Sequence, residues 1–372
     1  MSTARWIGRS GARHTAGVRD AVVAAVVLAV VTVYALTAAS PATRDIIVAF
    51  DVSVVFVMGL QVFSGNSGIL SFGHMSFVAI GAYVASFLTL DPSLKLSLAP
   101  GLPEPLASAT LGLWPATALS VVVAVAVAAV VGMVVLRLEG ASAVIAIFAL
   151  TLIVHVVLLG WTKVTNGAGG LYAMPKATTV TAGFIVAVVA VILAGLYHDS
   201  RHGLQLRASR EDAVAARSGG VRVRRVRLGA WALSAAISAA GGAMYAHLYT
   251  VATPDAFYLA PTFLVVVMLI VGGQASVGGA FAGAVVVTIV REVLKPVENS
   301  GVSLGPVQLD RVTGLTQMAL VALILIAMYV RPEGILGGPG GQRWTMRPRP
   351  FGRESELAGV DVAEGTTAPR GE

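Results

Sequence analysis

Long, continuous apolar runs separated by short polar segments are the feature that most limits what this chain can fold into. A helix needs about 20 mainly apolar residues to cross the hydrocarbon core of a bilayer. About ten runs approach or reach this length, and they cover residues 21–39, 46–63, 75–90, 113–136, 141–160, 180–197, 229–250, 261–273, 279–294 and 314–330. Because the runs are continuous rather than alternating, they predict helices and not the strands of a barrel. We therefore expect an all-α polytopic membrane protein.

The composition excludes several other classes of protein. Only 12% of the 372 residues are charged and 56% are hydrophobic, whereas soluble domains are about 25% charged. This excludes a soluble enzyme, a disordered chain and a nucleic-acid-binding domain. The chain has no cysteine, so disulfides and thiolate metal sites are excluded. A signal peptide is the alternative for 21–39, but the run is long and further spans follow at once.

The basic residues predict the orientation of the chain in the membrane. The net charge is +7, and arginines concentrate in the N-terminal tail, in the loop 198–228 and in the C-terminal tail. Under the positive-inside rule, both termini are cytoplasmic. The shorter segments 64–74, 137–140 and 274–278 then lie inside as well, provided that 261–294 makes two crossings. The proline-rich stretch 91–111 is then an external loop.

Three regions follow from this topology. We expect a basic cytoplasmic tail over 1–20, a transmembrane domain over 21–337 and a disordered cytoplasmic tail over 338–372. The loop 198–228 is the sizeable internal loop, and it is rich in arginine.

Part of this loop is predicted to be helical. Residues Arg210–Ser218 contain good helix formers, with acidic residues near the start, Arg217 near the end and Gly219-Gly220 directly after. A helix with Ala213 and Ala216 on a small-residue face can dock into the groove of a partner protein. The alternative is a solvated loop whose arginines contact anionic lipid headgroups.

Two glycine-rich segments interrupt the apolar pattern. Residues 66–73 contain Gly, Ser and Asn, and residues 272–279 repeat this character in the second half. Broken helices either line a transport path or form tight turns at the membrane edge. The candidates for lining a path are Asn66, Ser67, Gly68, Ser71, Gly73, His74, Gly272, Gly273 and Gln274.

A few single positions inside the spans carry separate expectations. Asp51 either lies within the second span or caps a span that begins later. His155 is expected to be a neutral imidazole bonded to a neighbouring helix. Ser234, Ser238 and Gly242 recur every fourth residue, which is typical of close helix packing.

Several short blocks together resemble the membrane permeases of ATP-binding-cassette (ABC) importers, specifically the branched-chain amino-acid type. Their order and spacing match over about residues 45–337. They are GNSGILSFGHMSF (65–77), RLEG (137–140) with TNGAGGL (165–171), GLQLRASREDAVAARSGG (203–220), and GGQASVGG (272–279) with PEGILG (332–337). Val214 stands where the general importer pattern Glu-Ala-Ala-x-x-x-Gly has its acid, whereas Ala215, Ala216 and Gly220 match that pattern.

The resemblance implies a transport subunit without an ATPase site of its own, and no Gly-Lys dipeptide of a phosphate-binding loop occurs. Separate subunits would bind ATP and Mg, and this chain would bind no cofactor and no metal. Further implied partners are a second, homologous permease in a heterodimer and an extracytoplasmic solute-binding protein, at the bacterial inner membrane. Contacts to the ATPase subunit are expected from Arg207, Arg210, Glu211, Asp212, Ala213, Ala215, Ala216, Arg217 and Gly220.

The expected cargo is a small polar solute. A branched-chain or other amino acid is favoured, with urea or a short amide as the alternative within the family. An ion-coupled secondary transporter and a membrane-embedded enzyme are the alternatives from other classes, but both need clustered ionisable groups inside the spans, and such residues are few here.

Overall fold

The computed structural model describes residues 16–300, 302–304, 307–309, 314–331 and 333–336. The predicted basic tail therefore lies outside the described residues up to position 15, and the predicted disordered tail 338–372 lies wholly outside them.

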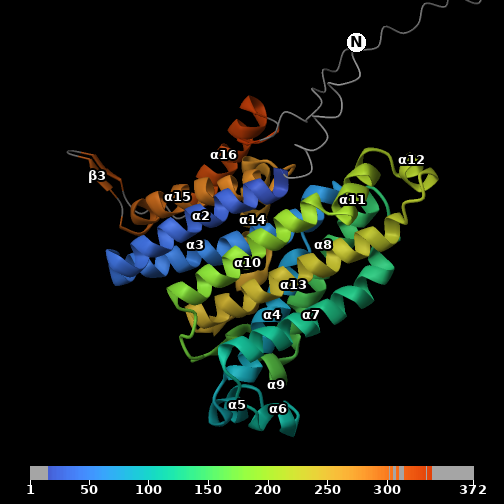
Figure 1. The fold of residues 1–372 in the computed structure, drawn as a ribbon. Coiled ribbons are helices and arrows are strands. Elements are labelled where there is room, and N and C mark those ends of the chain that lie inside the picture. Colours follow the sequence, from blue (N-terminus) through green and yellow to red (C-terminus); the bar gives the residue numbers. More distant parts are fainter. Residues whose placement is uncertain (1–15, 301, 305–306, 310–313, 332, 337–372) are drawn as a thin grey trace, which may run out of the picture. The chain divides into compact units, whose positions relative to one another are not determined.

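Apolar helices dominate the described part of the chain and confirm the all-α polytopic class (Figure 1). Eight of them are long and apolar enough to cross a membrane, and two shorter apolar helices accompany them. Every apolar run predicted from the sequence lies on one of these ten. They are α2 (Ala16–Thr37), α3 (Pro41–Leu60) continuing into the π-helical turn η1 (Gln61–Gly65), α4 (His74–Thr89), α7 (Leu113–Val135), α8 (Ala141–Gly160), α10 (Val180–Asp199), α13 (Val223–Tyr249), α14 (Leu259–Gly272), α15 (Val277–Ser300) and α16 (Leu315–Val330).

Short elements connect the long helices. They are α5 (Pro92–Leu98), α6 (Glu104–Ser108), α9 (Thr162–Thr165), η2 (Gly167–Gly169), α11 (Arg201–Glu211), α12 (Ala213–Ser218) and η3 (Pro254–Phe257). Two small antiparallel ribbons pair β1 (Leu171–Tyr172) with β2 (Val251–Ala252) and β3 (Val302–Leu304) with β4 (Val307–Leu309). The stretch expected to be a proline-rich loop thus contains α5 and α6, and Lys95 joins them by donating a hydrogen bond to the carbonyl of Leu106 at 3.0 Å.

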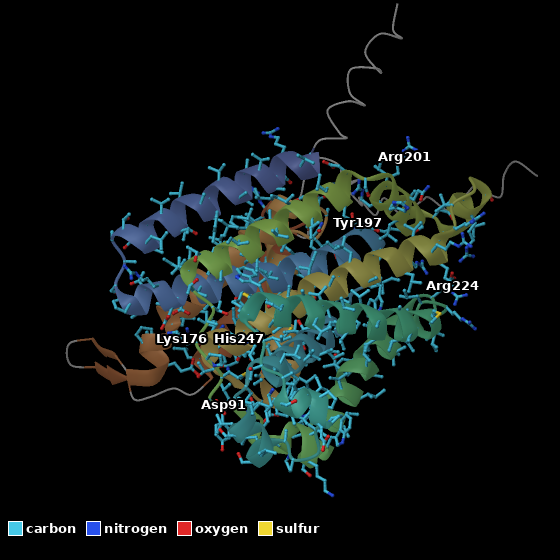
Figure 2. All side chains as sticks on the ribbon, turned by 60° about the horizontal axis from the view of Figure 1, so that its bottom comes forward. Asp91, Lys176, Tyr197, Arg201, Arg224 and His247 are labelled. Atoms are coloured by element: carbon cyan, nitrogen blue, oxygen red, sulfur yellow. The ribbon has the colours of Figure 1, made fainter. Side chains whose placement is uncertain are left out.

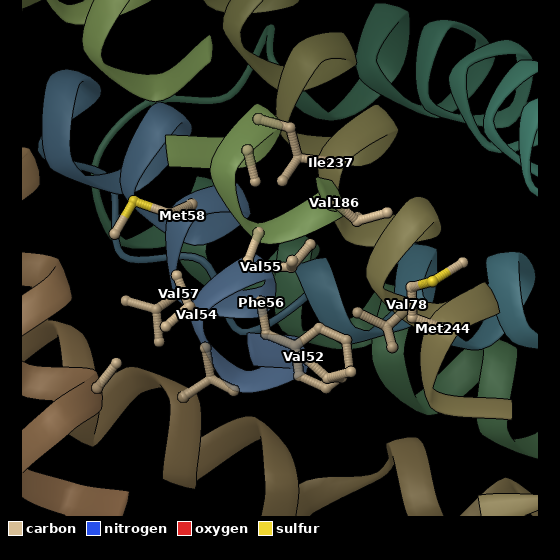
Figure 3. Packing of buried hydrophobic residues seen from close by; sticks show 14 of the residues in the cluster. Val52, Val54, Val55, Phe56, Val57, Met58, Val78, Val186, Ile237 and Met244 are labelled. Carbon is tan, nitrogen blue, oxygen red and sulfur yellow. The ribbon is translucent and has the colours of Figure 1, made fainter. Parts of the chain in front are cut away.

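Helix α13 lies at the centre and packs against α3, α4 and α7, while α2, α3 and α10 lie side by side (Figure 1). The core between them is built from buried aliphatic side chains. Figure 3 shows Val55 and Met58 of α3 in the same cluster as Val186 of α10 and Ile237 of α13. Burial of this apolar surface against neighbouring helices holds the bundle together through close packing.

Small residues let the central helices approach each other closely. Ser234, Ser238 and Gly242 are buried on α13, as their spacing predicts. A Cβ atom on Gly242 would lie 2.0 Å from the carbonyl oxygen of Val78 in α4, and one on Gly81 would lie 2.2 Å from that of Ala239. The two helices therefore contact backbone to backbone at these glycines.

Helices α7 and α8 bury only a narrow stripe of their surface. The buried residues of α7 recur mainly at every fourth position, at Ala116, Ser120, Ala124, Ala128 and Gly132. Large aliphatic side chains such as Val122 and Val134 are 63% and 68% exposed. An apolar face of this extent is suited to lipid or to another membrane helix.

The region 261–294 forms two separate helices that pack against each other, as the predicted topology required. Gly273 to Ser276 separate α14 from α15. A Cβ on Gly283 would lie 1.8 Å from the carbonyl oxygen of Met268, so the two helices touch through a glycine.

Two ionisable residues inside the spans have defined positions. Asp51 lies in the interior of α3, which begins at Pro41 with Ser40 as its cap. The alternative that Asp51 caps a later helix is therefore wrong. Its carboxylate oxygens are buried and have no partner among the described residues. His155 stacks on Tyr258, with ring centroids 3.8 Å apart, and its Nε2 lies 3.7 Å from an oxygen of Asp255.

Candidate functional site

The polar segment between α10 and α13 folds into two short helices rather than one. Asp212 separates α11 from α12 and has an extended backbone, with φ −152° and ψ 109°. Its carboxylate accepts hydrogen bonds from the N–H groups of Val214 at 2.8 Å and Ala215 at 3.0 Å. The prediction of a single helix over Arg210–Ser218 is therefore wrong, because an N-cap at Asp212 competes with continuation of the first helix.

We expect Asp212→Ala to destabilise α12 by about 1 kcal/mol, because the first N–H groups of the helix lose their acceptor. Amide hydrogen exchange over residues 213–218 should then become faster in the solubilised protein. Asp212→Ser keeps an acceptor and serves as the matched control. Unchanged exchange in Asp212→Ala would show that the cap contributes no stability.

The surface that α12 presents differs from the expected docking face. Ala216 is only 9% exposed, and its carbonyl accepts a hydrogen bond from the N–H of Val221 at 3.0 Å. Ala213 is half-buried, whereas Val214 is 70% exposed and Ala215 is exposed. The expectation that Ala216 faces a partner is wrong, because Ala216 packs against its own chain, whereas that for Ala213 stays a prediction.

Two arginines of α11 connect this loop to the first glycine-rich break. The Arg207 guanidinium donates hydrogen bonds to Asn66 Oδ1 at 3.0 Å and to the carbonyl of His198 at 2.7 Å. Arg210 donates to the carbonyl of Gly65 at 2.9 Å. Burial lowers the pKa of Arg207, and nearby Asp199 opposes that shift. Arginine stays charged under such conditions, so these are charge-assisted hydrogen bonds.

The first break is a turn held by its own side chains. The Asn66 amide donates to the carbonyl of Val62 at 3.0 Å, and Ser64 Oγ accepts from the N–H of Ser71 at 3.0 Å. Gly68 has a φ of +72°, and a Cβ there would lie 2.8 Å from the Arg210 side chain. Gly68 is exposed, while the other predicted lining residues, Asn66, Ser67, Ser71, Gly73 and His74, are all buried. In this conformation the segment is packed by protein.

The π-helical turn η1 before this break is a feature that sequence reasoning missed. It covers Gln61–Gly65, and neither side-chain amide atom of Gln61 has a partner among the described residues. π-Helical turns inside α-helices are often found at functional sites. A π-helical turn adds a single residue to one turn of a helix. The pattern of apolar residues does not indicate such an insertion, so this turn could not be predicted from the sequence.

The second glycine-rich break lies against the first. A Cβ on Gly65 would lie 2.5 Å from the carbonyl oxygen of Gln274. Gly272 and Gly273 are buried and Gln274 is half-buried. The backbones of the two breaks are therefore in direct contact.

The segment after α16 packs onto this second break. The N–H of Ile335 donates to the carbonyl of Val271 at 3.0 Å, and the N–H of Leu336 donates to that of Gly272 at 3.1 Å. Gly334 has a φ of +85°, and a Cβ there would lie 2.3 Å from the Gly273 Cα. Residues 272–279 and 333–336, which are far apart in the sequence, thus form one structural unit.

Acidic residues at the same end of the bundle join further helices. The Asp199 carboxylate accepts hydrogen bonds from the first N–H groups of α2, at Gly17 (3.0 Å) and Val18 (2.8 Å). Asp20 accepts from the N–H of Gly278 at 3.2 Å. Sequence reasoning missed both residues, because each caps a helix that is remote in the chain. Figure 2 shows Arg201 and Arg224 toward one end of the bundle and Asp91 and Lys176 toward the other.

The remaining predicted coupling residues lie on the outer surface of the loop. Arg217 forms an ion pair with Glu139 of the block RLEG, and both side chains are exposed. Glu211 is exposed, and Gly220, with a φ of +85°, turns the chain after α12. Within the described residues no group of three His, Asp or Glu side chains could hold a metal ion.

A family profile matches most of this assembly. The family is described as the permease component of branched-chain amino acid transport systems, and the match covers residues 42–329. The chain belongs to this permease family. The match includes both glycine-rich breaks together with α11 and α12, and it ends before residues 333–336.

The chain is also similar in sequence to individual branched-chain amino acid permeases. The chain is 26% identical over 332 residues to the high-affinity branched-chain amino acid transport system permease protein LivM of Escherichia coli, covering 80% of this chain and 70% of the relative. It is 25% identical over 327 residues to LivM of Salmonella typhimurium, covering 78% and 69%. It is 29% identical over 147 residues to a probable LivH permease of Methanocaldococcus jannaschii, covering 38% and 45%. No solved structure matches the chain significantly.

Proposed function

We propose that this chain is the membrane permease subunit of an ABC importer that carries a small polar solute, favouring branched-chain amino acids, into the cytoplasm. The observation that carries the proposal is the family match over residues 42–329, combined with the names of the LivM relatives. The chain itself would catalyse no reaction.

The contacts of α11 support mechanical coupling between a partner protein bound to α11 and α12 and the membrane helices. Val214 and Ala215 of α12 are exposed. Arg207 and Arg210 of the adjoining α11 donate hydrogen bonds to Asn66 and Gly65 at the end of η1. That end in turn contacts the second break at Gln274. A displacement of α11 and α12 by a partner protein can therefore move both glycine-rich breaks, because hydrogen-bonded and packed elements shift together.

The partners follow from this role. We propose that ATP and Mg are bound and ATP is hydrolysed on separate ABC subunits that contact α11 and α12. A solute-binding protein outside the bacterial inner membrane and a second, homologous permease complete the transporter. The arginine-rich loop supports a cytoplasmic position for α11 and α12, and with them for both termini.

The exposed side chain of Val214 gives a direct test. In the assembled transporter we expect Val214→Arg to weaken binding of the ATP-binding subunit by about tenfold. This is the effect of losing one buried valine contact and inserting a bulky charge. Affinity between purified permease and ATP-binding subunit, and solute-stimulated ATP hydrolysis, are the measurements.

Leu96 provides the matched control. It is 71% exposed on α5, within the segment that contacts α6 and α9 rather than α12. Leu96→Arg should leave the binding of the ATP-binding subunit unchanged. Normal binding and normal coupling in Val214→Arg would contradict the proposal, as would an equal loss in both variants.

A further inference from the structure

A strongly basic pocket lies where α7 ends beside the start of α13. Its volume is about 760 Å³, and it is lined by six arginines but only one acidic residue, Glu139. Aliphatic side chains such as Met133, Leu136 and Leu228 complete the lining. The pocket is therefore cationic at its polar groups and apolar between them.

Glycines in the sequence build this pocket. A Cβ on Gly132 would lie 2.8 Å from the Leu228 side chain and 2.9 Å from that of Trp231, so a larger residue there would require these side chains to shift. Gly140 (φ +60°) and Gly220 (φ +85°) turn the chain beyond α7 and α12. These turns place both arginine-bearing segments around the same space.

The charges of the pocket are only partly balanced. Arg217 is paired with Glu139. Arg137 and Arg224 donate to the carbonyl of Met133, at 3.0 and 2.9 Å, at the end of α7. Two further arginines of the lining, Arg222 and Arg225, are exposed.

Arg227 is the residue that points most directly to a missing ligand. It is 8% exposed, and its buried Nε has no hydrogen-bond partner among the described residues. An unsatisfied buried donor is costly, and a charged one more so. An anion that enters the pocket would supply the acceptor.

The position of the pocket selects the kind of anion. It lies at the ends of two candidate membrane spans, α7 and α13, where apolar sequence gives way to arginine. On α7, Val130 and Val134 are 63% and 68% exposed next to this end. A ligand with a phosphate group and an apolar tail would satisfy both surfaces, and basic pockets between membrane helices suit such headgroups.

We propose that this pocket binds the phosphate group of an anionic phospholipid, with an acyl chain along the exposed face of α7. Guanidinium groups bind phosphate through paired, charge-assisted hydrogen bonds. The bound lipid would brace α7 against α13 and the turn after α12. This inference does not depend on the transported solute.

Native mass spectrometry of the full-length protein in mild detergent tests the proposal. The probes are phosphatidylglycerol, phosphatidylcholine with the same acyl chains, and inorganic phosphate. Both lipids carry the phosphate, but the six arginines of the lining repel the choline cation of phosphatidylcholine. Phosphatidylglycerol should therefore bind about tenfold more tightly than phosphatidylcholine. The double variant Arg222→Gln/Arg225→Gln and the single variant Arg227→Gln should each lose this preference.

Arg201→Gln is the matched control, because Arg201 is an exposed arginine of α11 that does not line the pocket. It should keep the preference. An equal loss in Arg201→Gln would overturn the proposal, since general surface charge would then explain the binding. The exposed pair decides the question even if Arg227→Gln fails to fold.

Two further outcomes would overturn the lipid assignment. If inorganic phosphate competes as well as phosphatidylglycerol, the site takes a soluble anion. If Arg222→Gln/Arg225→Gln keeps the lipid preference but no longer binds the ATP-binding subunit, the pocket is a protein interface.

Discussion

Gly242→Val is expected to prevent α13 from packing against α4 and to remove most of the folded protein. A Cβ at this position would lie 2.0 Å from the Val78 carbonyl oxygen and 3.0 Å from the Ala82 nitrogen, and these are backbone atoms that cannot rotate away. Overpacking of this kind costs about 3 kcal/mol or more where the neighbours cannot relax. Thermal unfolding and the yield of monodisperse protein after solubilisation are the measurements.

Gly229 lies on the same helix and provides the control for this prediction. A Cβ at Gly229 would meet no atom within 4 Å, and the position is exposed. Gly229→Val should therefore change stability by no more than about 0.5 kcal/mol. Equal melting temperatures for the two variants would show that the close contact between α4 and α13 does not determine stability.

Arg207→Ala is expected to separate the polar loop from the first break. The substitution removes the donor to Asn66 Oδ1 and to the His198 carbonyl. It leaves both acceptors without their charged partner, at a cost of about 3 kcal/mol for two charge-assisted hydrogen bonds. Transport should fall strongly while ATP hydrolysis continues without solute control. Unfolding of the permease, and transport and ATP hydrolysis in vesicles, measure the two effects.

A double-mutant cycle shows whether the contact to Asn66 carries this effect. Asn66→Ala, Arg207→Ala and the double variant should give a coupling energy of about 1–2 kcal/mol, because the residues share a hydrogen bond. Arg201→Ala, an exposed residue of the same helix, should be neutral within about 0.5 kcal/mol. Additive effects of the two substitutions would contradict a direct link between loop and break.

The apolar helices and their packing residues were predictable from local patterns. A continuous apolar run identifies a membrane helix because the bilayer demands internal hydrogen bonding of the backbone. In the same way, Ser234, Ser238 and Gly242 identify a packing face by their spacing alone, and the structure confirms it. The family blocks identified the permease family for the same reason, since each block is contiguous in the chain.

Other local predictions failed where side chains compete with helical periodicity. The residues on both sides of Asp212 are good helix formers. Its carboxylate nevertheless caps α12, so the predicted single helix is interrupted there. The small residues near Ala216 in the sequence predicted a surface that faces a partner, yet Ala216 is buried by its own chain. Helix formers alone do not show which face of a short helix the rest of the fold covers.

The sequence by itself determined the class of protein, the sites of the membrane helices and the concentration of positive charge in one loop and two tails. It determined these because hydrophobicity and charge act locally along the chain. Only the tertiary structure decided that Arg207 meets Asn66, that Gly65 meets Gln274, and that the arginines beside α7 and α13 surround one pocket. Such contacts join residues far apart in sequence, and they depend on how the helices pack rather than on the pattern within any one of them.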